Sequence, residues 1–341
     1  IGIVSIGKSN SIVVTTASTS AEGEVVKFEG KTADVNAILA TLTYQSALNW
    51  NSDSNSHDSI TISVNDKGSS GGGGPQTTKK TIDVYVTSVN DAPVITSPDA
   101  QSVNEDETLK VTGLSVHDVD SAETYGSVLE VSLVVGHGSL SLSSTAGLFI
   151  SEGSQSGMGR ELKFQGGEKS VNAAIAGLSY VSDINWHGVD SLSMSVSDLG
   201  NSGSGGVLTA DASIAVTVAS INDAPRVDVP AAVVAAVEDN VRSLDGIRVE
   251  DLDLDAEQQN KAQLTVSISV DRALVSLKTT EPVRYTSGNG KAATSMVFGG
   301  SVEVINKALK GLKYHPGKDS IDRVVIEVND HGNVGSGGAL L

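Results

Sequence analysis

The sequence contains no cysteine, few aromatic residues and no long apolar run. Without cysteine, the chain has no disulfide, no thiol nucleophile and no cysteine-ligated zinc site. Aromatic residues make up 4% of the chain, which favours several small packed units over one large core. No apolar stretch approaches the roughly 20 residues of a membrane span. We therefore predict no membrane span in this fragment.

Basic residues are also scarce. Lys and Arg total 23 against 41 Asp and Glu, which gives a formal charge of -18. Such a field repels nucleic acid and anionic membrane surfaces and attracts cations. We therefore predict no nucleic-acid partner and look for cation ligands.

One pattern occurs three times along the chain. The segments "KFEGKTADVNAILATLTY" (27–44), "KFQGGEKSVNAAIAGLSY" (163–180) and "VFGGSVEVINKALKGLKY" (297–314) align without gaps. Their phenylalanines, Phe28, Phe164 and Phe298, each stand 16 residues before a tyrosine, at Tyr44, Tyr180 and Tyr314. Repetition at a fixed period is typical of tandem repeat proteins. We interpret each Phe and Tyr as a core residue.

The pairs Ala92-Pro93 and Ala224-Pro225 mark the boundaries between copies. They divide the chain into the C-terminal part of a repeat (1–92), a complete repeat (93–224) and a repeat lacking its last strand (225–341). The chain opens at "GIVSI", the counterpart of "GSLSL" at 138–142, and closes on "GSGGALL", the counterpart of "GSGGVLT" at 203–209. We expect a window from a longer array.

Within each repeat, most segments alternate apolar residues with Ser or Thr, as in "LEVSLVV" and "ASIAVTV". This period of two predicts half-buried antiparallel strands, and the close turns favour a β-sandwich. The segment before each Tyr differs, because Val171, Ala174, Ile175 and Leu178 have helical spacing, with Ser170 as the expected N-cap. The fold class is therefore all-β: tandem immunoglobulin-like sandwiches, each with one short inserted helix.

Acidic and amide side chains recur at the ends of strands and near the boundaries. Asn90-Asp91 and Asn222-Asp223 precede the two Ala-Pro pairs, while Asp118 and Asp120 recur as Asp251 and Asp253, and Asp66 as Asp198 and Asp330. Loops at alternate ends of antiparallel strands gather at one pole, so we expect Asp118, Asp120 and Asp198 to face the linker above. Glu105 is expected to face the linker below. A Ca²⁺ ion takes six to eight such oxygen ligands.

These motifs resemble the calcium motifs of cadherin repeats: "VSDLG" around Asp198, "VNDAP" at the linker, Glu105 near the start, and the Asp118-x-Asp120 pair. The "VNEDE", "VNAAIAGLSY" and "GVDSL" segments are closer to the cadherin-like, chondroitin-sulfate-proteoglycan-type repeats of large extracellular proteins. The cadherin linker begins with Asp and ends with Asn. Here those positions are Ser88 and Ala92, so we expect one or two ions per joint rather than three.

The resemblance implies two complete joints in this chain. One would use Asn90, Asp91, Asp118, Asp120 and Asp198, with its Glu before residue 1. The other would use Glu105, Asn222, Asp223, Asp251, Asp253 and Asp330. Asp66 would serve a joint further upstream. Turn capping is the alternative reason for these residues.

Other residues give weaker signals. Trp50 and Trp186 either pack against the helix, which we favour, or form a glycan-stacking surface. His137, His187 and His315 share no ligand spacing, and we interpret them as loop residues. The glycine-rich tracts at 68–75 and 200–206 are expected to be mobile loops between strands. "GSSGG" at 68–72 lacks the strand–turn–helix context of a hydrolase elbow.

We predict a non-enzymatic structural or adhesive segment of a long extracellular, cell-surface protein, with joints stiffened by calcium. Its partners would be calcium, neighbouring repeats, and homotypic or other surface proteins. Two alternatives remain open: a subunit of a laterally assembled fibre or appendage, and arrayed carbohydrate-binding modules with glycan partners.

Overall fold

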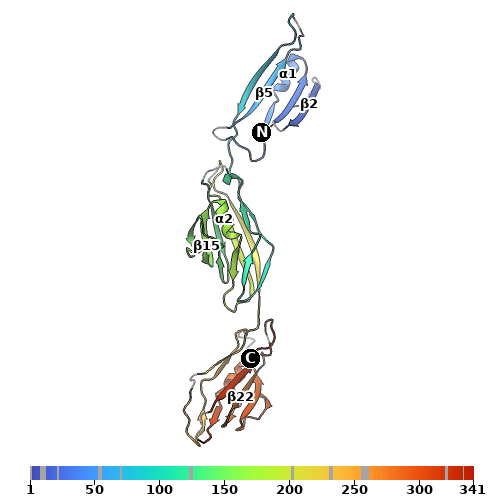
Figure 1. Cartoon of the computed structure of the whole chain (residues 1–341). Coiled ribbons are helices and arrows are strands. Elements are labelled where there is room, and N and C mark those ends of the chain that lie inside the picture. The colour runs from blue at the N-terminus through green and yellow to red at the C-terminus, as the bar shows by residue number, and fades with distance from the viewer. Residues whose placement is uncertain are drawn as a thin grey trace.

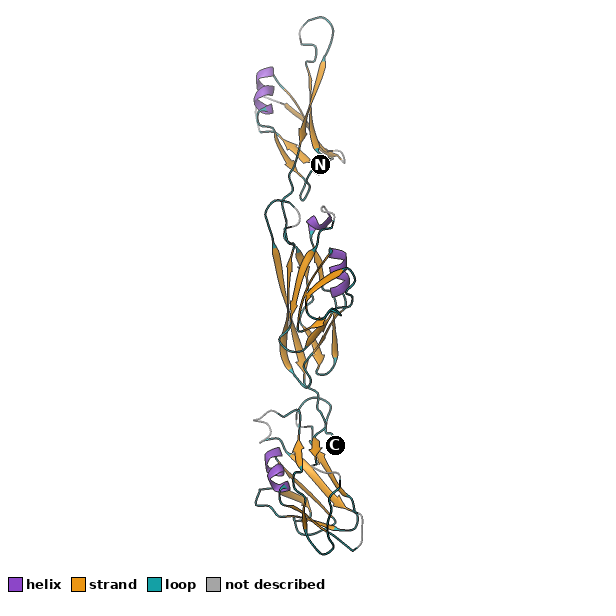
Figure 2. Cartoon of the chain, turned by 90° about the vertical axis from the view of Figure 1, so that its left-hand side faces the viewer, coloured by secondary structure: helices purple, strands orange, loops and turns teal. Residues whose placement is uncertain are grey.

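The computed structural model has three β-rich units placed end to end in an extended molecule (Figures 1 and 2). The structure describes residues 2–7, 13–20, 23–52, 56–69, 71–122, 126–200, 203–229, 233–254, 261–318, 322–332 and 334–341. Among these described residues, no hydrogen-bonded sheet contains strands from two units. No helix within these ranges is long and apolar enough to cross a membrane.

The middle unit is a two-sheet sandwich. A six-stranded sheet has the order β13-β15-β11-β17-β18-β8, and a four-stranded sheet has the order β14-β12-β16-β9. Its pairs are antiparallel except for β18 with β8, which run parallel. The elements are β7 (Val94–Thr96), β8 (Gln101–Asn104), β9 (Thr108–Val111), β10 (Ser115–His117), the 3₁₀ turn η1 (Val119–Ala122), β11 (Leu129–Val134), β12 (Ser139–Ser141), β13 (Leu148–Glu152), β14 (Met158–Gly159), β15 (Glu161–Gly166), α2 (Glu168–Ile175), β16 (Leu178–Val181), β17 (Gly188–Ser197) and β18 (Thr209–Ala219).

The other two units repeat parts of this plan. The first contains β1 (Gly2–Ser5), β2 (Val13–Ser20), β3 (Gly23–Glu29), α1 (Thr32–Leu39), β4 (Thr43–Ser46), β5 (Asp58–Asn65) and β6 (Thr77–Val84). The third contains β19 (Arg226–Asp228), β20 (Arg242–Ser243), β21 (Arg248–Glu250), β22 (Leu264–Val270), β23 (Leu274–Leu277), β24 (Arg284–Ser287), β25 (Ser295–Gly300), α3 (Val302–Leu309), β26 (Leu312–His315) and β27 (Val324–Asn329). Strand β27 ends its sheet, whereas its counterpart β17 pairs with β18.

The predicted all-β class with one short helix per unit is confirmed. The expected apolar face of the middle helix is also present, because Val171, Ala174 and Ile175 are buried. The predicted N-cap was wrong: α2 begins at Glu168, its N-cap is Gly167, and Ser170 lies in the first turn. In α3 the counterpart of Gly167 is Ser301, whose side chain accepts a hydrogen bond from the Val304 backbone N–H.

The repeated aromatic residues anchor the cores of the two more complete units. Phe164, Phe298 and Tyr180 have no exposed surface. Phe28 is only half-buried, and Ile38 is the one buried apolar residue among those described in 2–92. The first unit has fewer strands, so less apolar surface is covered there.

The helix of each of the two more complete units also positions a strand. The Asn172 side chain of α2 accepts a hydrogen bond from the Val116 backbone N–H at 2.8 Å and donates one to the Val116 carbonyl at 2.7 Å. Asn306 of α3 makes the same pair of bonds to Val249. Because β10 and β21 lead directly into the two Asp-x-Asp segments, each helix sets where those carboxylates lie.

Candidate metal-binding joints

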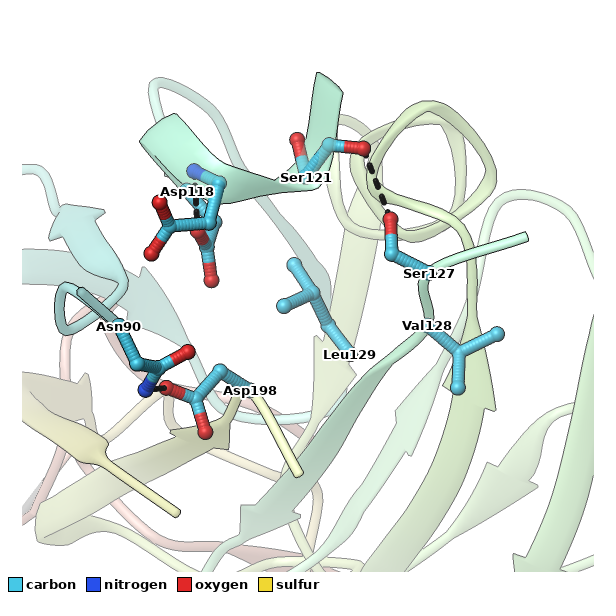
Figure 3. A pocket seen from close by; sticks show the side chains of 8 residues that line it. Asn90, Asp118, Ser121, Ser127, Val128, Leu129 and Asp198 are labelled. Atoms are coloured by element: carbon cyan, nitrogen blue, oxygen red, sulfur yellow. Dashed lines mark hydrogen bonds between the residues drawn. The ribbon is translucent and has the colours of Figure 1, made fainter. Parts of the chain in front are cut away.

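The first joint brings together residues from both sides of the linker. Asn90, Asp118, Asp120 and Asp198 are all buried, and they line a cavity of about 10 Å³, close to the room that one water molecule needs. Figure 3 shows Asn90, Asp118 and Asp198 facing this space. The structure thus brings these four residues together at the first joint.

Hydrogen bonds hold each side chain of this joint in place. The Asn90 amide donates to Asp198 Oδ2 at 2.5 Å, and the Asp91 backbone N–H donates to Asp120 Oδ2 at 2.6 Å. Asp118 Oδ1 accepts from the Asp120 backbone N–H at 2.9 Å, which closes the η1 turn. The Asp91 side chain itself is exposed.

The second joint repeats this arrangement. The Asn222 amide donates to Asp330 Oδ2 at 2.5 Å, and the Asp223 backbone N–H donates to Asp253 Oδ2 at 2.7 Å. Asp251 Oδ1 accepts from the Asp253 N–H at 3.2 Å. Glu105, which is buried, joins them from the middle unit by accepting from the Ile221 N–H at 2.6 Å.

The carboxylates at the joints raise one another's pKa. Burial, followed by the charges of Asp120, Asp198 and Glu168, raises the pKa of Asp118. Burial raises the pKa of Asp253 to about 6, with contributions from Asp223, Asp251 and Glu105. The pKa values of Asp251 and Asp223 are also raised, chiefly by burial.

Asp330 behaves differently from its neighbours. Burial pushes the pKa of its carboxyl up, but hydrogen bonds from the Leu340 and Gly332 backbone N–H groups and the Asn222 amide hold it below the usual value. The Asp330 carboxyl therefore remains ionised beside Asp251 and Asp253, whose pKa values are raised.

The donor chemistry of these joints fits a hard divalent cation. Asp223 Oδ2 is buried and has no hydrogen-bond partner, and a buried carboxylate oxygen without a partner is costly. Within the described ranges, Asp251 and Asp253 form no salt bridge to Lys or Arg. In this conformation, however, no group of three or more His, Asp or Glu side chains in the described ranges is arranged to hold a metal ion. Binding would require side chains to turn away from their present N–H donors.

Asp66 follows β5 at the end of the first unit that lies opposite the first joint. Its carboxylate accepts from the Gly68 and Gln76 backbone N–H groups at 2.8 Å each, which lowers its pKa. Asp198 accepts the equivalent bonds from Gly200 and Leu208. The structure therefore gives Asp66 the same local geometry but no described partner across a joint.

Two acidic residues at the joints were not predicted from the sequence. Glu168, at the start of α2, accepts from the Asp118 N–H at 3.2 Å and the Ser121 hydroxyl at 2.5 Å. Its counterpart in α3 is Val302, so a search for repeated positions does not find it. Asp106 contributes to the raised pKa of Asp223, and only the fold brings these two together.

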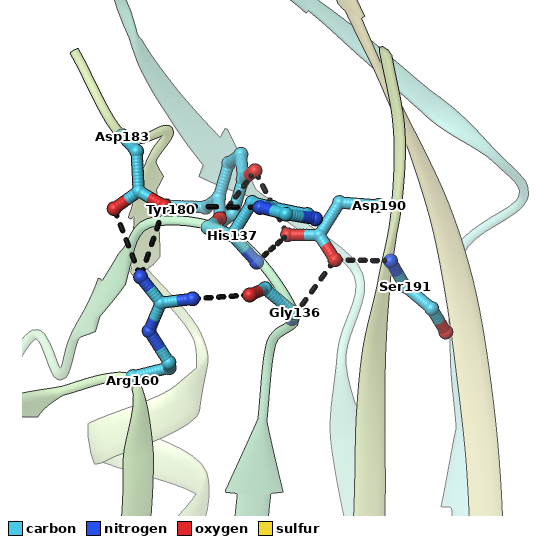
Figure 4. A network of polar contacts seen from close by, with 7 residues as sticks. All are labelled: Gly136, His137, Arg160, Tyr180, Asp183, Asp190 and Ser191. Carbon is cyan, nitrogen blue, oxygen red and sulfur yellow. Dashed lines mark hydrogen bonds and ion pairs between the residues drawn. The ribbon is translucent and has the colours of Figure 1, made fainter. Parts of the chain in front are cut away.

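A third unpredicted feature is a Tyr–Asp network, which Figure 4 shows for the middle unit. The Tyr180 hydroxyl donates to Asp190 Oδ2 at 3.0 Å and to the His137 carbonyl at 2.8 Å. Asp190 also accepts from the Gly136, His137 and Ser191 backbone N–H groups. Tyr44 with Asp58 and Tyr314 with Asp322 repeat the contact. Asp58, Asp190 and Asp322 stand 132 residues apart, and this spacing could have revealed the network from the sequence.

The remaining sequence interpretations have mixed outcomes. Trp186 is half-buried against the core, and its ring stacks on His137 with centroids 4.1 Å apart. His315 was wrongly assigned to a loop, since it ends β26 and hydrogen-bonds Ser276. The Nδ1 atom of His187 lies 3.8 Å from Oε2 of Glu105 at the second joint.

No protein-family model and no curated protein matches the chain. Among solved structures, it is similar to a protocadherin gammaB7 EC3-6 cis-dimer structure, with 20% identity, a TM-score of 0.33, and coverage of 96% of this chain and 63% of that one. It is also similar to mouse cadherin-23 EC22-24, with 13% identity, a TM-score of 0.30, and coverage of 80% and 73%. The human desmocollin-1 ectodomain gives 13% identity, a TM-score of 0.29, and coverage of 79% and 45%. The chain thus spans less than two thirds of the protocadherin structure.

The three structures named here consist of cadherin ectodomain repeats. At these identities and TM-scores, the likeness is no argument about function. The sandwich architecture rests on the strands and sheets of the chain itself.

Proposed function

We propose that the chain is a structural or adhesive segment of a long extracellular repeat protein, and that calcium bound at its joints stiffens it. The proposal includes the division at residues 92 and 224 and the cadherin-like, chondroitin-sulfate-proteoglycan-type character of the repeats. The observation that carries it is the convergence of buried carboxylates and one Asn at each joint, with residues from both adjoining units.

The electrostatics support a cation at these positions. Carboxylates crowded at a partly desolvated joint repel each other, by roughly 4 kcal/mol for a pair 4 Å apart at an intermediate dielectric. A divalent cation would remove that repulsion and would satisfy the Asp223 oxygen that lacks a partner. Asp118, Asp120 and Asp198 would hold it at the first joint. Glu105, Asp223, Asp251, Asp253 and Asp330 would hold it at the second.

Calorimetric titration with calcium tests this proposal. The wild-type chain should bind saturably at two joints, the Asp118→Ala/Asp120→Ala variant should lose the first class of sites, and Asp251→Ala/Asp253→Ala the second. Asp211→Ala, on an exposed position of β18, controls for the loss of acidic charge and should bind as the wild type does. Absence of saturable binding, or equal loss in the Asp211 control, would rule out local sites.

A further inference from the structure

The glycine-rich loop of one unit pairs with the linker of the unit before it. The Asn90 backbone N–H donates to the Ser204 carbonyl at 2.8 Å, and the Ser204 N–H donates to the Ser88 carbonyl at 3.0 Å. These bonds form a parallel β-bridge between Val89 and Ser204. A mobile loop was expected at 200–206; in the structure, Ser204 of this loop pairs with the linker through these hydrogen bonds.

The second joint contains the same bridge. The Asn222 N–H donates to the Ser336 carbonyl at 2.8 Å, and the Ser336 N–H donates to the Ser220 carbonyl at 3.0 Å. Ile221 and Ser336 are the bridged pair. We call the two contacts, Ser88–Asn90 with Ser204 and Ser220–Asn222 with Ser336, the loop–linker bridges. Each bridge consists of backbone hydrogen bonds and one bond from the Ser204 or Ser336 hydroxyl to the linker carbonyl, so it needs no metal.

Side chains add selectivity for the linker sequence. The Asn90 amide reaches both Asp198 Oδ2 and the Gly206 carbonyl, the latter at 2.9 Å. The Asn222 amide reaches Asp330 and the Gly338 carbonyl in the same way. The segment that fits this loop is therefore an extended Ser–β-branched–Asn strand.

One glycine in each loop is required by close approach. Gly203 has φ +69°, and a Cβ atom there would lie 2.6 Å from the Asn90 nitrogen. Gly335 has φ +80°, and its Cβ would lie 2.5 Å from the Asn222 nitrogen. Gly206 has a similar φ of +79°, but nothing lies within 4 Å of its Cβ position. Of these three positions, only Gly203 and Gly335 therefore need glycine because the linker backbone lies so close.

The loop has this shape even where no linker lies against it. In the first unit, no atom lies within 4 Å of the Cβ positions of Gly71, Gly72, Gly73 and Gly74. The positive φ angles nevertheless match: Gly68, Gly71, Gly73 and Gly74 have +69°, +84°, +133° and +75°, and Gly200, Gly203, Gly205 and Gly206 have +65°, +69°, +136° and +79°. The loop conformation is thus set by its own sequence, with its Asp accepting two backbone N–H bonds.

We propose that the glycine-rich loop is a preformed docking site for the linker strand of the adjoining repeat, and that the loop–linker bridges hold successive units together without metal. Addition of an extended segment by main-chain bonds is a common recognition mode. The joint then has two parts: a backbone bridge that is always present and a carboxylate cluster that responds to cations. The second part rests on the proposed function, and the first does not.

Distance measurements between spin labels test the bridge in the metal-free chain. Because the sequence has no cysteine, labels can be placed at Lys79→Cys and Lys169→Cys, both exposed, to span the first joint. Gly203→Ala should broaden the metal-free distance distribution at least twofold. Gly71→Ala, at the matching loop position of the first unit with φ +84° and nothing within 4 Å of its Cβ position, should leave it unchanged.

Labels at Lys169→Cys and Lys310→Cys span the second joint and provide a local control. That distribution should be insensitive to Gly203→Ala and should broaden in Gly335→Ala but not in Gly71→Ala. In a Trp50→Phe background, Trp186 fluorescence checks that the middle unit stays folded. If Gly203→Ala unfolds that unit, the Gly335→Ala measurement at the second joint tests the proposal instead. Equal widths for contact and open-space variants would overturn the proposal. Calcium titration of the same variants reports separately on the metal sites.

Discussion

Replacing Asn172 with alanine tests how the helix positions the first joint. The substitution removes both hydrogen bonds to Val116, a residue 2% exposed, and leaves its backbone N–H and carbonyl without those partners. Two lost bonds next to a buried backbone correspond to about 2–4 kcal/mol of unfolding free energy for the middle unit. Asn306→Ala should cost a similar amount in the third unit, where the same bonds reach Val249.

The two tryptophans allow the middle unit to be followed alone. In a Trp50→Phe background, Trp186 is the sole tryptophan, and its fluorescence during urea unfolding reports on the core that it contacts. Lys169→Ala, an exposed change on the same helix, should alter stability by less than about 0.5 kcal/mol. If Asn172→Ala were as mild as Lys169→Ala, the helix would not be holding β10, and our reasoning would be refuted.

Three further predictions concern the core, the tyrosine network and pH. Phe164→Ala should destabilise the middle unit by about 3–5 kcal/mol in urea unfolding. Phe28→Ala should destabilise the first unit by clearly less, because Phe28 is only half-buried. Equal losses of unfolding free energy would contradict this difference in burial. Tyr180→Phe removes bonds to Asp190 and the His137 carbonyl and should cost about 1–3 kcal/mol in the same assay; an unchanged midpoint would argue against the network. The pKa of Asp253 is raised to about 6 in the folded chain, so folding takes up a proton there, and stability falls as the pH rises from about 4 to 6. Calorimetry of the metal-free chain should therefore give a higher melting temperature for the third unit at pH 5 than at pH 7; a lower one would show that the carboxylates are not crowded.

Features that repeat at a constant spacing could be predicted from the sequence. The Phe-to-Tyr segments located the three helices, and the recurrence of Asp118-x-Asp120 as Asp251-x-Asp253 located the joints. Period-two alternation identified strands such as β11 and β22 because alternate residues along them are buried in the core. The helix start was missed because Ser170 has the right chemistry for a cap, while the chain at Gly167 has the extended backbone that precedes a helix.

Contacts made by only one repeat, or across a joint, could not be found in this way. Glu168 has no acidic counterpart in α3. The glycine-rich loops were expected to be mobile because of their composition alone. Composition does not show that a side chain at Gly203 would clash with the Asn90 backbone, or that the loop pairs with the linker strand. Spacing alone does not identify which segment meets a loop from the next unit.

Small-angle X-ray scattering of the whole chain, with calcium and after its removal, tests the central claim most directly. In the metal-free chain the joints should flex about the loop–linker bridges because the carboxylates repel each other. Calcium should then lengthen the molecule, increasing its maximum dimension in the wild type but not in a variant with Asp118, Asp120, Asp251 and Asp253 all replaced by alanine. Identical scattering of the wild type in both conditions would contradict the claim that metal binding stiffens these joints.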